Sequence, residues 1–391
     1  MNDQVTAGRD AKEDLRVTLT RTAAPGQGVS IQLESTVKGM YGDSIMALVE
    51  RTAAALGLQD MVISVDDQGA LEWVIQARVE AAARALDPAL DAEALPEMHR
   101  NNDYAVARDR MRRSRLYLPG NAPDLMLGAG LFTPDGIILD LEDAVAPPQK
   151  PAARLLVRNA LRAVDFGGAE RMVRINQIPT GLDDLPFVVN HNVHLILVPK
   201  VEAAEQLTAV VERIKTLTDR EIYLMPILES ALGIERAFEI ASAHESVVAM
   251  AFGAEDFTKD IGAARTDLGT ESFVARCRLV LAARAAGIQP IDTVYSDVGN
   301  EAGLLASTRE AIALGFDGKG CIHPRQIRVI HDAFRPADKD VIYALMVKHA
   351  LEKAEARGDG VISIGSKMID PPVVGRALRV LRLAQFYNID L

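Results

Sequence analysis

From Arg113 onward the sequence alternates short apolar runs with longer stretches of helical character, and this rhythm limits the fold more than any other feature of the chain. Such alternation is typical of parallel βα units, in which each buried strand is followed by a helix. Eight runs have the composition of strands: residues 116–118, 136–141, 172–175, 195–198, 222–226, 247–252, 289–291 and 320–322. Eight strands close a (βα)8 TIM barrel, so we predict an α/β fold built on such a barrel.

The segment before the barrel predicts a small α+β domain. At 391 residues the chain exceeds the usual size of one compact unit, so a second domain is expected. Residues 29–33 and 62–65 have the composition of strands, and residues 41–56 and 70–86 that of amphipathic helices. We predict three regions: residues 1–88 as the α+β domain, residues 89–111 as a linker, and residues 112–391 as the barrel domain with a C-terminal extension.

Composition excludes whole classes of partner. The formal net charge of −11 argues against a nucleic-acid or anionic-membrane binder, because both need a positive surface. Cys277 and Cys321 are too few for a disulfide framework, which favours a reducing cytoplasm. The amino terminus lacks the features of a signal peptide, and no apolar run has the length of a membrane span. A cytoplasmic protein that acts on a small molecule is the expectation.

Charged side chains follow most of the predicted strands. They are Glu142, Asp143, Arg174, Lys200, Glu229, Glu255, Asp256 and Asp292. Active sites of TIM barrels lie at the carboxyl ends of the strands, so these residues predict a site at the barrel mouth. For any single position, a strand end that is polar because it is solvated is the alternative explanation.

Two of these carboxylates suit a metal ion. Glu229 and Asp256 end neighbouring strands one βα repeat apart, so we expect them side by side at the mouth. Mg²⁺ prefers hard oxygen ligands and often takes only one or two protein carboxylates, which leaves positions for substrate and water. We therefore predict Glu229 and Asp256 as Mg²⁺ ligands, with helix capping by Asp256 as the alternative.

Eight motifs, in order along the chain, resemble the citrate lyase β-subunit and its relatives, the malyl-CoA and citramalyl-CoA lyases. They are RSRLYLPG at 113–120, LDLEDAV at 139–145, VRIN at 173–176, VPK at 198–200, LES at 228–230, FGAED at 252–256, GFDGKGCIHP at 315–324 and KMID at 367–370. The resemblance implies a Mg²⁺-dependent carbon–carbon lyase. Its expected substrate is a 3-hydroxy-dicarboxylic acyl-CoA, such as citramalyl-CoA, malyl-CoA or citryl-CoA, and its expected products are acetyl-CoA and a 2-keto acid.

The resemblance also implies roles for single residues. Arg174 matches an arginine that faces the thioester carbonyl and enolate, and Asp370 matches an aspartate that serves as acid/base in the site of a neighbouring subunit. A homotrimer or a dimer of trimers is therefore expected. We interpret Glu142 and Asp143 as groups that fix metal waters or Arg174, or alternatively as an N-cap pair for the next helix.

Basic residues of the barrel motifs are candidates for the phosphates of CoA. Arg113, Arg115 and Lys319 could bind phosphates as planar forks or point charges. His191 and His194 lack an acid at metalloprotease spacing, and we interpret them as surface residues.

The first domain resembles the citrate lyase γ-subunit, a small acyl carrier. The matching segments are GVSIQL at 28–33, YGDSI at 41–45 and VDDQGAL at 65–71. In that family a serine before the first strand holds a phosphopantetheine-type arm, whereas Lys12 and Glu13 stand at the matching position here. A phosphodiester needs a hydroxyl group, so we expect no covalent prosthetic group.

Other functions compete with a lyase that acts on free CoA thioesters. The chain could be a β-subunit-like component of a multi-subunit citrate lyase acting on a carrier-bound citryl thioester, a thioester-independent aldolase of hydroxy-keto acids, or a scaffold without activity. The missing serine favours the free thioester. Arg174, Glu229 and Asp256 argue against a scaffold, which has no need of all three.

Overall fold

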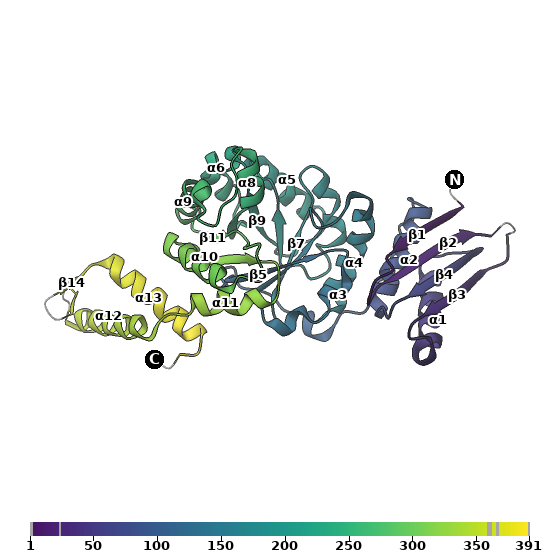
Figure 1. Cartoon of the computed structure of the whole chain (residues 1–391), viewed down its shortest axis with the longest axis horizontal. Helices are drawn as coiled ribbons and strands as arrows, with labels where there is room; N and C mark the ends of the chain where they lie inside the picture. Colours follow the sequence, from purple (N-terminus) through teal and green to yellow (C-terminus); the bar gives the residue numbers. More distant parts are fainter. Residues whose placement is uncertain (1–2, 23–24, 358–361, 365–366, 390–391) are drawn as a thin grey trace. The chain divides into compact units, whose positions relative to one another are not determined.

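The computed structural model describes residues 3–22, 25–357, 362–364 and 367–389 of the chain. The chain forms two compact units, Met1–Ile327 and Arg328–Leu391. The first unit contains the amino-terminal domain and the barrel, and the second contains the C-terminal helices (Figure 1).

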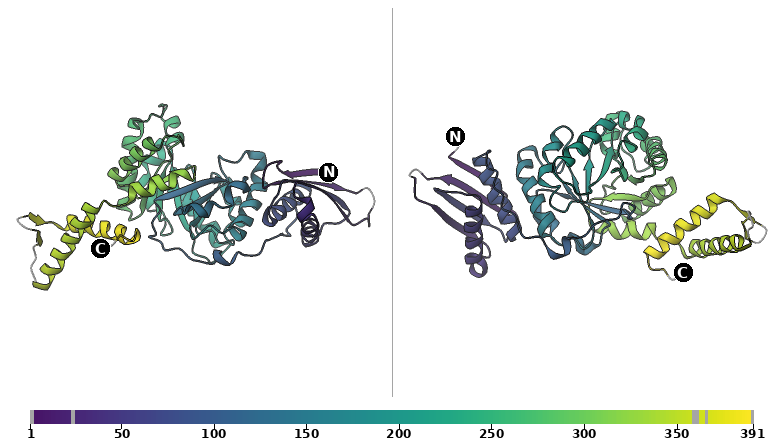
Figure 2. Two further views of the ribbon diagram at one scale, coloured as in Figure 1. Left: turned by 60° about the horizontal axis from the view of Figure 1, so that its bottom comes forward. Right: turned by 180° about the vertical axis from the view of Figure 1, so that it is seen from behind.

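The amino-terminal domain is a four-stranded sheet with two helices on one face (Figure 2). Its elements are β1 (Gln4–Gly8), β2 (Leu15–Arg21), β3 (Val29–Ser35), α1 (Lys38–Ala55), β4 (Met61–Asp67) and α2 (Glu72–Leu86). The strand order is β1-β2-β4-β3, in which β3 and β4 are parallel and the other pairs are antiparallel. The sequence predicted β3, β4 and both helices, but it did not predict β1 or β2.

Eight parallel strands close the predicted barrel. They are β5 (Ser114–Pro119), β6 (Gly136–Asp140), β7 (Glu170–Arg174), β8 (Leu195–Val198), β9 (Tyr223–Leu228), β10 (Ala249–Phe252), β11 (Gln289–Asp292) and β12 (Gly318–Cys321). Each strand pairs with the next one in the chain, and β12 pairs with β5 to complete the ring. The predicted fold, a (βα)8 TIM barrel with a small amino-terminal α+β domain, is therefore confirmed.

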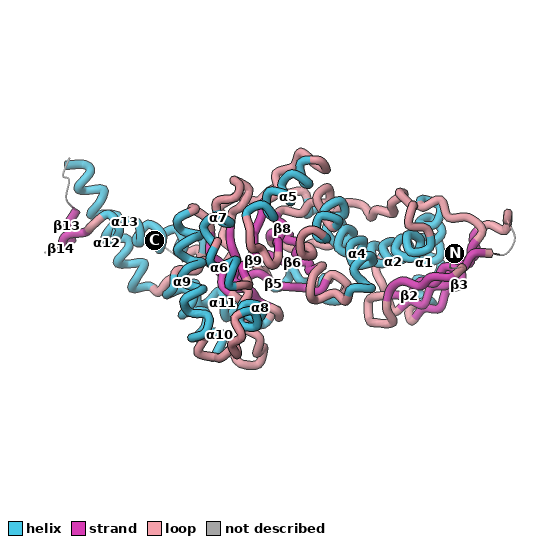
Figure 3. The backbone as a smooth tube through the Cα atoms, turned by 90° about the horizontal axis from the view of Figure 1, so that it is seen from above, coloured by secondary structure: helices cyan, strands magenta, loops and turns pink. Residues whose placement is uncertain are grey.

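Helices surround the barrel strands, as the tube in Figure 3 shows. They are α3 (Pro123–Met126), α4 (Lys150–Ala163), α5 (Ala204–Lys215), α6 (Ala231–Glu235), α7 (Ala237–Ala241), α8 (Ala254–Asp260), α9 (Thr270–Ala285) and α10 (Glu301–Leu314). The next helix, α11 (Arg325–Phe334), begins in the first unit and continues in the second. Short 3-10 turns occur at η1 (Arg100–Asn102), η2 (Ala129–Phe132), η3 (Pro147–Gln149), η4 (Thr180–Asp183) and η5 (Leu185–Phe187). Of the helices in the described residues, none is both long enough and apolar enough to span a bilayer.

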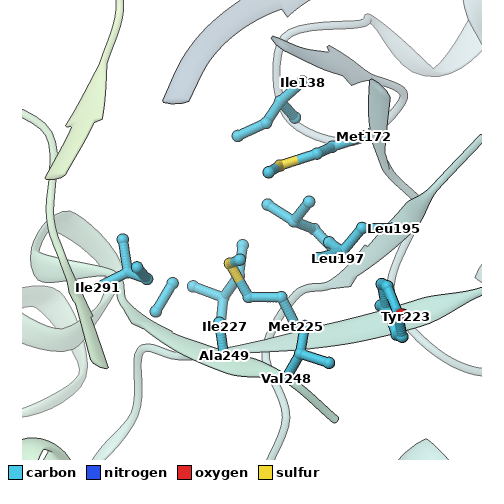
Figure 4. Packing of buried hydrophobic residues seen from close by; sticks show 11 residues of the cluster. Ile138, Met172, Leu195, Leu197, Tyr223, Met225, Ile227, Val248, Ala249 and Ile291 are labelled. Atoms are coloured by element: carbon cyan, nitrogen blue, oxygen red, sulfur yellow. The ribbon is translucent and has the colours of Figure 1, made fainter. Parts of the chain in front are cut away.

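Apolar side chains fill the interior of the barrel (Figure 4). The buried cluster consists of Ile138, Met172, Leu195, Leu197, Tyr223, Met225, Ile227, Val248, Ala249, Ala251 and Ile291. Because TIM-barrel interiors are packed layers of side chains and not pores, this cluster closes the barrel below its mouth. The interior of the barrel is therefore filled, and a site is expected at the carboxyl ends of the strands.

The amino-terminal domain packs on the barrel through α2 and α4. Glu80 of α2 and Arg158 of α4 form a fully buried ion pair with a distance of 2.6 Å between Oε2 and Nη2. Asn159 Nδ2 donates to the Trp73 carbonyl at 3.0 Å. The segment predicted as a linker also lies against the barrel, because Asn102 Nδ2 donates to carbonyl groups at the carboxyl end of α4.

The second unit is a helical pair joined through a short two-stranded ribbon. It contains α12 (Asp338–Arg357), β13 (Ile362–Ile364), β14 (Lys367–Ile369) and α13 (Pro371–Phe386). Its core is formed by Ala344, Val347, Ile369, Ala377 and Leu381.

Candidate active site

A cavity of about 370 Å³ opens at the carboxyl ends of the barrel strands. Its lining includes polar side chains that lie in, end or follow six different strands: Arg115, Tyr117, Asp140, Asp143, Arg174, Glu229, Asp256 and Asp292. Five of the residues predicted from the sequence as catalytic, metal-binding or substrate-binding line this one cavity: Asp143, Arg115, Arg174, Glu229 and Asp256.

Arg174 ends β7 and is held rigidly by two carboxylates. Its Nε and Nη2 donate to Asp140 Oδ1 and Oδ2 at 2.7 and 2.6 Å. Its Nη1 lies 2.9 Å from Glu142 Oε2, in charge contact without the alignment of a hydrogen bond. Burial alone would lower the pKa of Arg174. The hydrogen bonds and the charge of Asp140 outweigh burial, so the pKa of Arg174 is raised above the ordinary value of an arginine. The guanidinium is a permanent, oriented cation.

Asp140 is a site residue that the sequence analysis did not identify. It is 1% exposed, and besides Arg174 it accepts hydrogen bonds from the backbone N–H groups of Glu142 and Ala144. The signal that could have found it is the period of two along β6, because Asp140 lies two residues after the inward-facing Ile138. Asp140 therefore fixes both the arginine and the loop that follows β6.

Glu142 and Asp143 converge on Lys200 at the mouth. Lys200 Nζ lies 3.1 Å from Glu142 Oε1, 3.5 Å from Asp143 Oδ2 and 3.7 Å from Asp256 Oδ2. Burial raises the pKa of Glu142, which is 3% exposed. Lys200 also has a backbone φ of 50°, a left-handed conformation that is uncommon outside glycine and asparagine and that concentrates at functional sites.

Glu229 lies deeper in the cavity than Asp256. Glu229 is 6% exposed, and its Oε1 accepts from the backbone N–H of Lys200 at 2.8 Å. Burial, and then the charge of Glu142, raise the pKa of Glu229 to about 7. A side chain on Gly253 would place its Cβ only 2.4 Å from Glu229 Oε2, so a glycine is required for this carboxylate to fit. Asp256 stands in the first turn of α8 with its side chain 34% exposed.

The balance of charge at the mouth fits a divalent cation. Glu142, Asp143, Glu229 and Asp256 supply four carboxylates, whereas Lys200 is the cation in direct charge contact with three of them. In the described part of the chain, no group of three or more His, Cys, Asp or Glu side chains converges tightly enough to form a complete ligand cage. Such an arrangement suits Mg²⁺, which keeps several water ligands.

Two of the residues predicted to contact CoA phosphates lie elsewhere. Arg113 is buried before the start of β5, where Nε and Nη2 donate to Asp135 at 2.8 and 2.7 Å. Lys319 is fully buried, and its Nζ donates to Asp292 at 2.8 Å. Both side chains are buried and are already paired with a carboxylate. The prediction of phosphate contacts for Arg113 and Lys319 was therefore wrong.

Arg115 occupies a different position, on the floor of the cavity. It is 1% exposed and lines the cavity, and its Nη1 contacts Met225 Sδ at 2.9 Å. Its Nε is buried and has no hydrogen-bond partner among the described residues. Burial lowers the pKa of Arg115. The cavity floor thus has an unpaired cation, which lies too deep for a phosphate group at the barrel surface.

The interpretation of His191 and His194 as surface residues was also wrong, because they are 6% and 5% exposed. His194 Nδ1 accepts from the backbone N–H of Arg171, and its Nε2 contacts the Tyr104 carbonyl at 2.9 Å. Burial, and then the charge of Arg171, lower the pKa of His194 to about 3. Both histidines are buried and have a structural role.

Asp370 belongs to the second unit. It is exposed and stands at the N-cap of α13, where its backbone carbonyl accepts from the N–H groups of Val373 and Val374.

Comparisons with known proteins agree with this geometry. Residues 113–324 match the family described as HpcH/HpaI aldolase/citrate lyase. Citrate lyase subunit beta of Leuconostoc mesenteroides subsp. cremoris is 40% identical and aligns with 71% of this chain and 94% of its own length. Mitochondrial citramalyl-CoA lyase of Homo sapiens is 32% identical, over 70% of this chain and 85% of its own. The crystal structure of CitE from Mycobacterium tuberculosis with magnesium, acetoacetate and coenzyme A has a TM-score of 0.59 and 31% identity, over 71% of this chain and 100% of that one.

The barrel and its charged mouth define the chain as a carbon–carbon lyase of the TIM-barrel class. The chain belongs to the HpcH/HpaI aldolase/citrate lyase family. Residues 2–86 match a separate acyl-carrier family described as malonate decarboxylase delta subunit (MdcD), which confirms the carrier-like character of the first domain.

Proposed function

We propose that this chain cleaves a 3-hydroxy-dicarboxylic acyl-CoA, such as citramalyl-CoA, malyl-CoA or citryl-CoA, into acetyl-CoA and a 2-keto acid, and that it requires Mg²⁺. The observation that carries the proposal is the placement of Arg174, which is clamped by Asp140 and lines the same cavity as Glu229 and Asp256. The similarity to proteins named citrate lyase subunit beta and citramalyl-CoA lyase supports an acyl thioester as the substrate.

The reaction develops negative charge at a defined place. A base removes the proton of the 3-hydroxyl group, the C2–C3 bond breaks, and its electron pair becomes the enolate of the acetyl thioester. That enolate then takes a proton at carbon to give acetyl-CoA. Arg174 has five N–H groups, of which two donate to Asp140. Its Nη1 is in charge contact with Glu142 without a hydrogen bond. The N–H groups that Asp140 does not use can bind the thioester oxygen, and because the fork is fixed beforehand, no reorganisation is needed when the charge appears.

Glu229 and Asp256 are the residues that would hold Mg²⁺. When bound, the ion would polarise the hydroxyl or keto oxygen and the neighbouring carboxylate of the substrate. Glu142 and Asp143 hold Arg174 and Lys200 next to this pair. We assign the acid/base role to Asp370 of a neighbouring subunit, on the resemblance of its KMID segment to the lyase family.

A substrate panel tests the proposal directly. The full chain is incubated with Mg²⁺ and with citramalyl-CoA, malyl-CoA or citryl-CoA, and acetyl-CoA is measured together with pyruvate, glyoxylate or oxaloacetate. We expect equal amounts of acetyl-CoA and one keto acid, and loss of turnover when Mg²⁺ is chelated. Turnover that persists without a divalent metal would contradict the metal assignment, and no cleavage of any of the three thioesters would contradict the substrate class.

Variants at the metal pair separate a site effect from a folding effect. Glu229→Gln and Asp256→Asn keep the shape of each side chain but remove its charge, so we expect loss of turnover and weaker Mg²⁺ binding in calorimetry. Glu212→Gln, an exposed carboxylate on α5 with a side chain 64% exposed, is the matched control and should change neither. Mg²⁺ affinity equal to that of the unchanged chain in both site variants would exclude these residues as ligands.

A second candidate function is supported by the similarity to citrate lyase subunit beta. That relative is a β-subunit, so the chain could act on a citryl thioester that a separate carrier protein presents. The purified chain would then cleave free CoA thioesters poorly and would gain activity when an acylated carrier is added. Full activity on a free CoA thioester would exclude this alternative.

A further inference from the structure

A second cavity lies where the amino-terminal domain meets the barrel. Its volume is about 450 Å³, and its walls come from β1, α2, α4 and the loops after β5 and β6. Its lining consists of Thr6, Ala7, Gly8, Arg9, Arg78, Ala81, Arg84, Ala85, Asn121, Pro148, Gln149, Pro151, Ala152, Arg154, Leu155 and Phe187. Four of these residues are arginines, and none of the described lining residues is acidic.

Two of these arginines, Arg78 and Arg154, are each held by a buried carboxylate and keep donors for a ligand, whereas Arg84 already donates to Glu80 and to the carbonyl groups of Leu90 and Ala92. Arg78 is 2% exposed and donates through Nε and Nη2 to the fully buried Asp14 at 2.8 and 2.7 Å. Arg154 donates through Nε to the fully buried Asp184 at 2.7 Å. The Arg78 Nη1 and both Nη atoms of Arg154 have no acceptor among the described residues. Arginines fixed by a buried carboxylate, with free donors in a cavity, are suited to binding phosphate.

The remaining wall of the cavity is apolar and partly flat. The guanidinium groups of Arg84 and Arg154 lie 6.0 and 5.8 Å from the centre of the Phe187 ring. Ala81, Ala85 and Leu155 add small apolar surfaces. A ligand that matches this wall combines a planar ring with phosphate groups, because planar guanidinium and phenyl faces stack on rings.

The cavity is connected to the active site through shared loops. Pro119 lines the barrel mouth and Asn121 lines the second cavity, so a single residue, Gly120, lies between them in the chain. Asp143 and Ala144 line the mouth, and Pro148 and Gln149, further along the same loop after β6, line the second cavity. A step of two residues along the chain spans at most about 7 Å, so residues that line the two cavities lie near each other. This nearness is within the reach of a ligand with an extended, flexible arm.

We propose that this second cavity binds the phosphorylated nucleotide end of a CoA thioester whose acyl end lies in the barrel mouth. The inference rests on the proposed function, since it specifies where the CoA part of that substrate is held. The amino-terminal domain then contributes a wall of the substrate site, and the arm that a carrier would hold through a covalent bond is held here through non-covalent contacts to its nucleotide.

The test places a negative charge in the cavity without removing any arginine. Ala152 lies in the first turn of α4 and lines the cavity. Ala152→Glu introduces a carboxylate that repels phosphate and pairs with the arginines, whereas Ala152→Gln adds the same bulk without charge. Binding of CoA, 3′-dephospho-CoA, adenosine 3′,5′-bisphosphate and pantetheine is measured by calorimetry, which needs no turnover and so stays informative if the proposed reaction fails.

We expect the Kd for CoA to be about tenfold or more higher in Ala152→Glu than in Ala152→Gln, as one unfavourable charge at close range predicts. The two variants should bind pantetheine equally, and adenosine 3′,5′-bisphosphate should compete with CoA in the unchanged chain. In turnover, the KM for a CoA thioester should rise in Ala152→Glu, while the KM for the matching pantetheine thioester should not. If Ala152→Glu and Ala152→Gln bind CoA with nearly equal Kd values, the proposal is overturned. Tight binding of the free nucleotide without competition against CoA would also overturn it, because the cavity would then take a free nucleotide.

Discussion

Replacing Asp140 with asparagine tests whether the proposed cleavage depends on the fixed orientation of Arg174. Asp140 is 1% exposed, and its two oxygens accept from Arg174 at 2.7 and 2.6 Å. Asparagine keeps the shape of the side chain but replaces one acceptor oxygen with an NH2 group and removes the negative charge. Arg174 would then retain Glu142 as its charged partner, with less constraint on the direction of its fork.

The expected fall in kcat/KM follows from the hydrogen bond that the substitution removes. A hydrogen bond to a charged group is worth about 1.5–3 kcal/mol, and the substitution removes one of the two that Asp140 makes with Arg174. If this energy orients the fork in the transition state, kcat/KM should fall roughly 10- to 150-fold, at about 1.4 kcal/mol per factor of ten. Arg174→Lys should lose more, because a point charge cannot be held by both oxygens of Asp140.

The matched control is Asp135→Asn, at the amino ends of the strands. Asp135 holds Arg113 with the same two-oxygen geometry, at 2.7 and 2.8 Å. We expect both asparagine variants to lower the Tm, but only Asp140→Asn to lower kcat/KM measured well below that Tm. A purely structural role for Asp140 would give the same result as the control. A kcat/KM for Asp140→Asn within a factor of about three of the unchanged enzyme, less than about 0.7 kcal/mol, would refute the reasoning.

Four further predictions address other parts of the chain. Mixing inactive Asp370→Ala chains with inactive Asp256→Ala chains should restore part of the activity; no recovery despite proven subunit exchange would contradict a role for Asp370 in a neighbour's site. Intact-protein mass spectrometry of the chain from its native host should give the bare polypeptide mass, and a stoichiometric adduct in the first domain would restore the carrier role. Arg115→Met should keep or raise the Tm, because it removes a buried cation whose Nε has no hydrogen-bond partner among the described residues, and should raise the KM; an unchanged KM would show that this cation on the cavity floor does not contact substrate. The folded state keeps His194 neutral with a pKa near 3, so its contribution to stability is complete above pH 6.5 and is lost as pH falls, at up to about 1.4 kcal/mol per pH unit; equal acid sensitivity of His194→Gln in urea unfolding would contradict this.

The barrel could be predicted because its strands are buried on both faces. Runs such as 195–198 are apolar throughout, and the helices between them have their own period, so both signals stand out in the sequence. β2 was missed although Leu15, Val17 and Leu19 are fully buried. Its apolar residues alternate with arginine and threonine, and this one-sided pattern is weaker than a continuous apolar run. β1 is short and has a single buried residue, Ala7, so its place in the sheet depends on pairing with β2.

The sequence indicated site residues at positions where a charged residue follows a predicted strand. It gave no correct role for residues whose role depends on the direction in which the side chain points. Asp140 lies inside β6, and only its inward direction makes it a partner of Arg174. Arg113 and Lys319 occur in matching motifs, but their partners Asp135 and Asp292 come from other segments of the chain. A motif gives the type of residue at a position, whereas burial and partner depend on contacts that form only in the folded barrel.

The contacts of the first domain fit the fixed wall proposed above better than they fit a travelling carrier. The loop at Lys12, where a carrier's serine would stand, is anchored by Asp14, which is fully buried under Arg78. Arg78 also donates to the carbonyl of Asn121, in the barrel loop after β5. A carrier must leave one site to reach another, whereas a wall of a substrate cavity must stay in place. Because this loop is tied to the rim of the barrel, we expect a covalent arm attached to it to have little reach, in line with the prediction that Lys12 and Glu13 stand where a carrier has its modified serine.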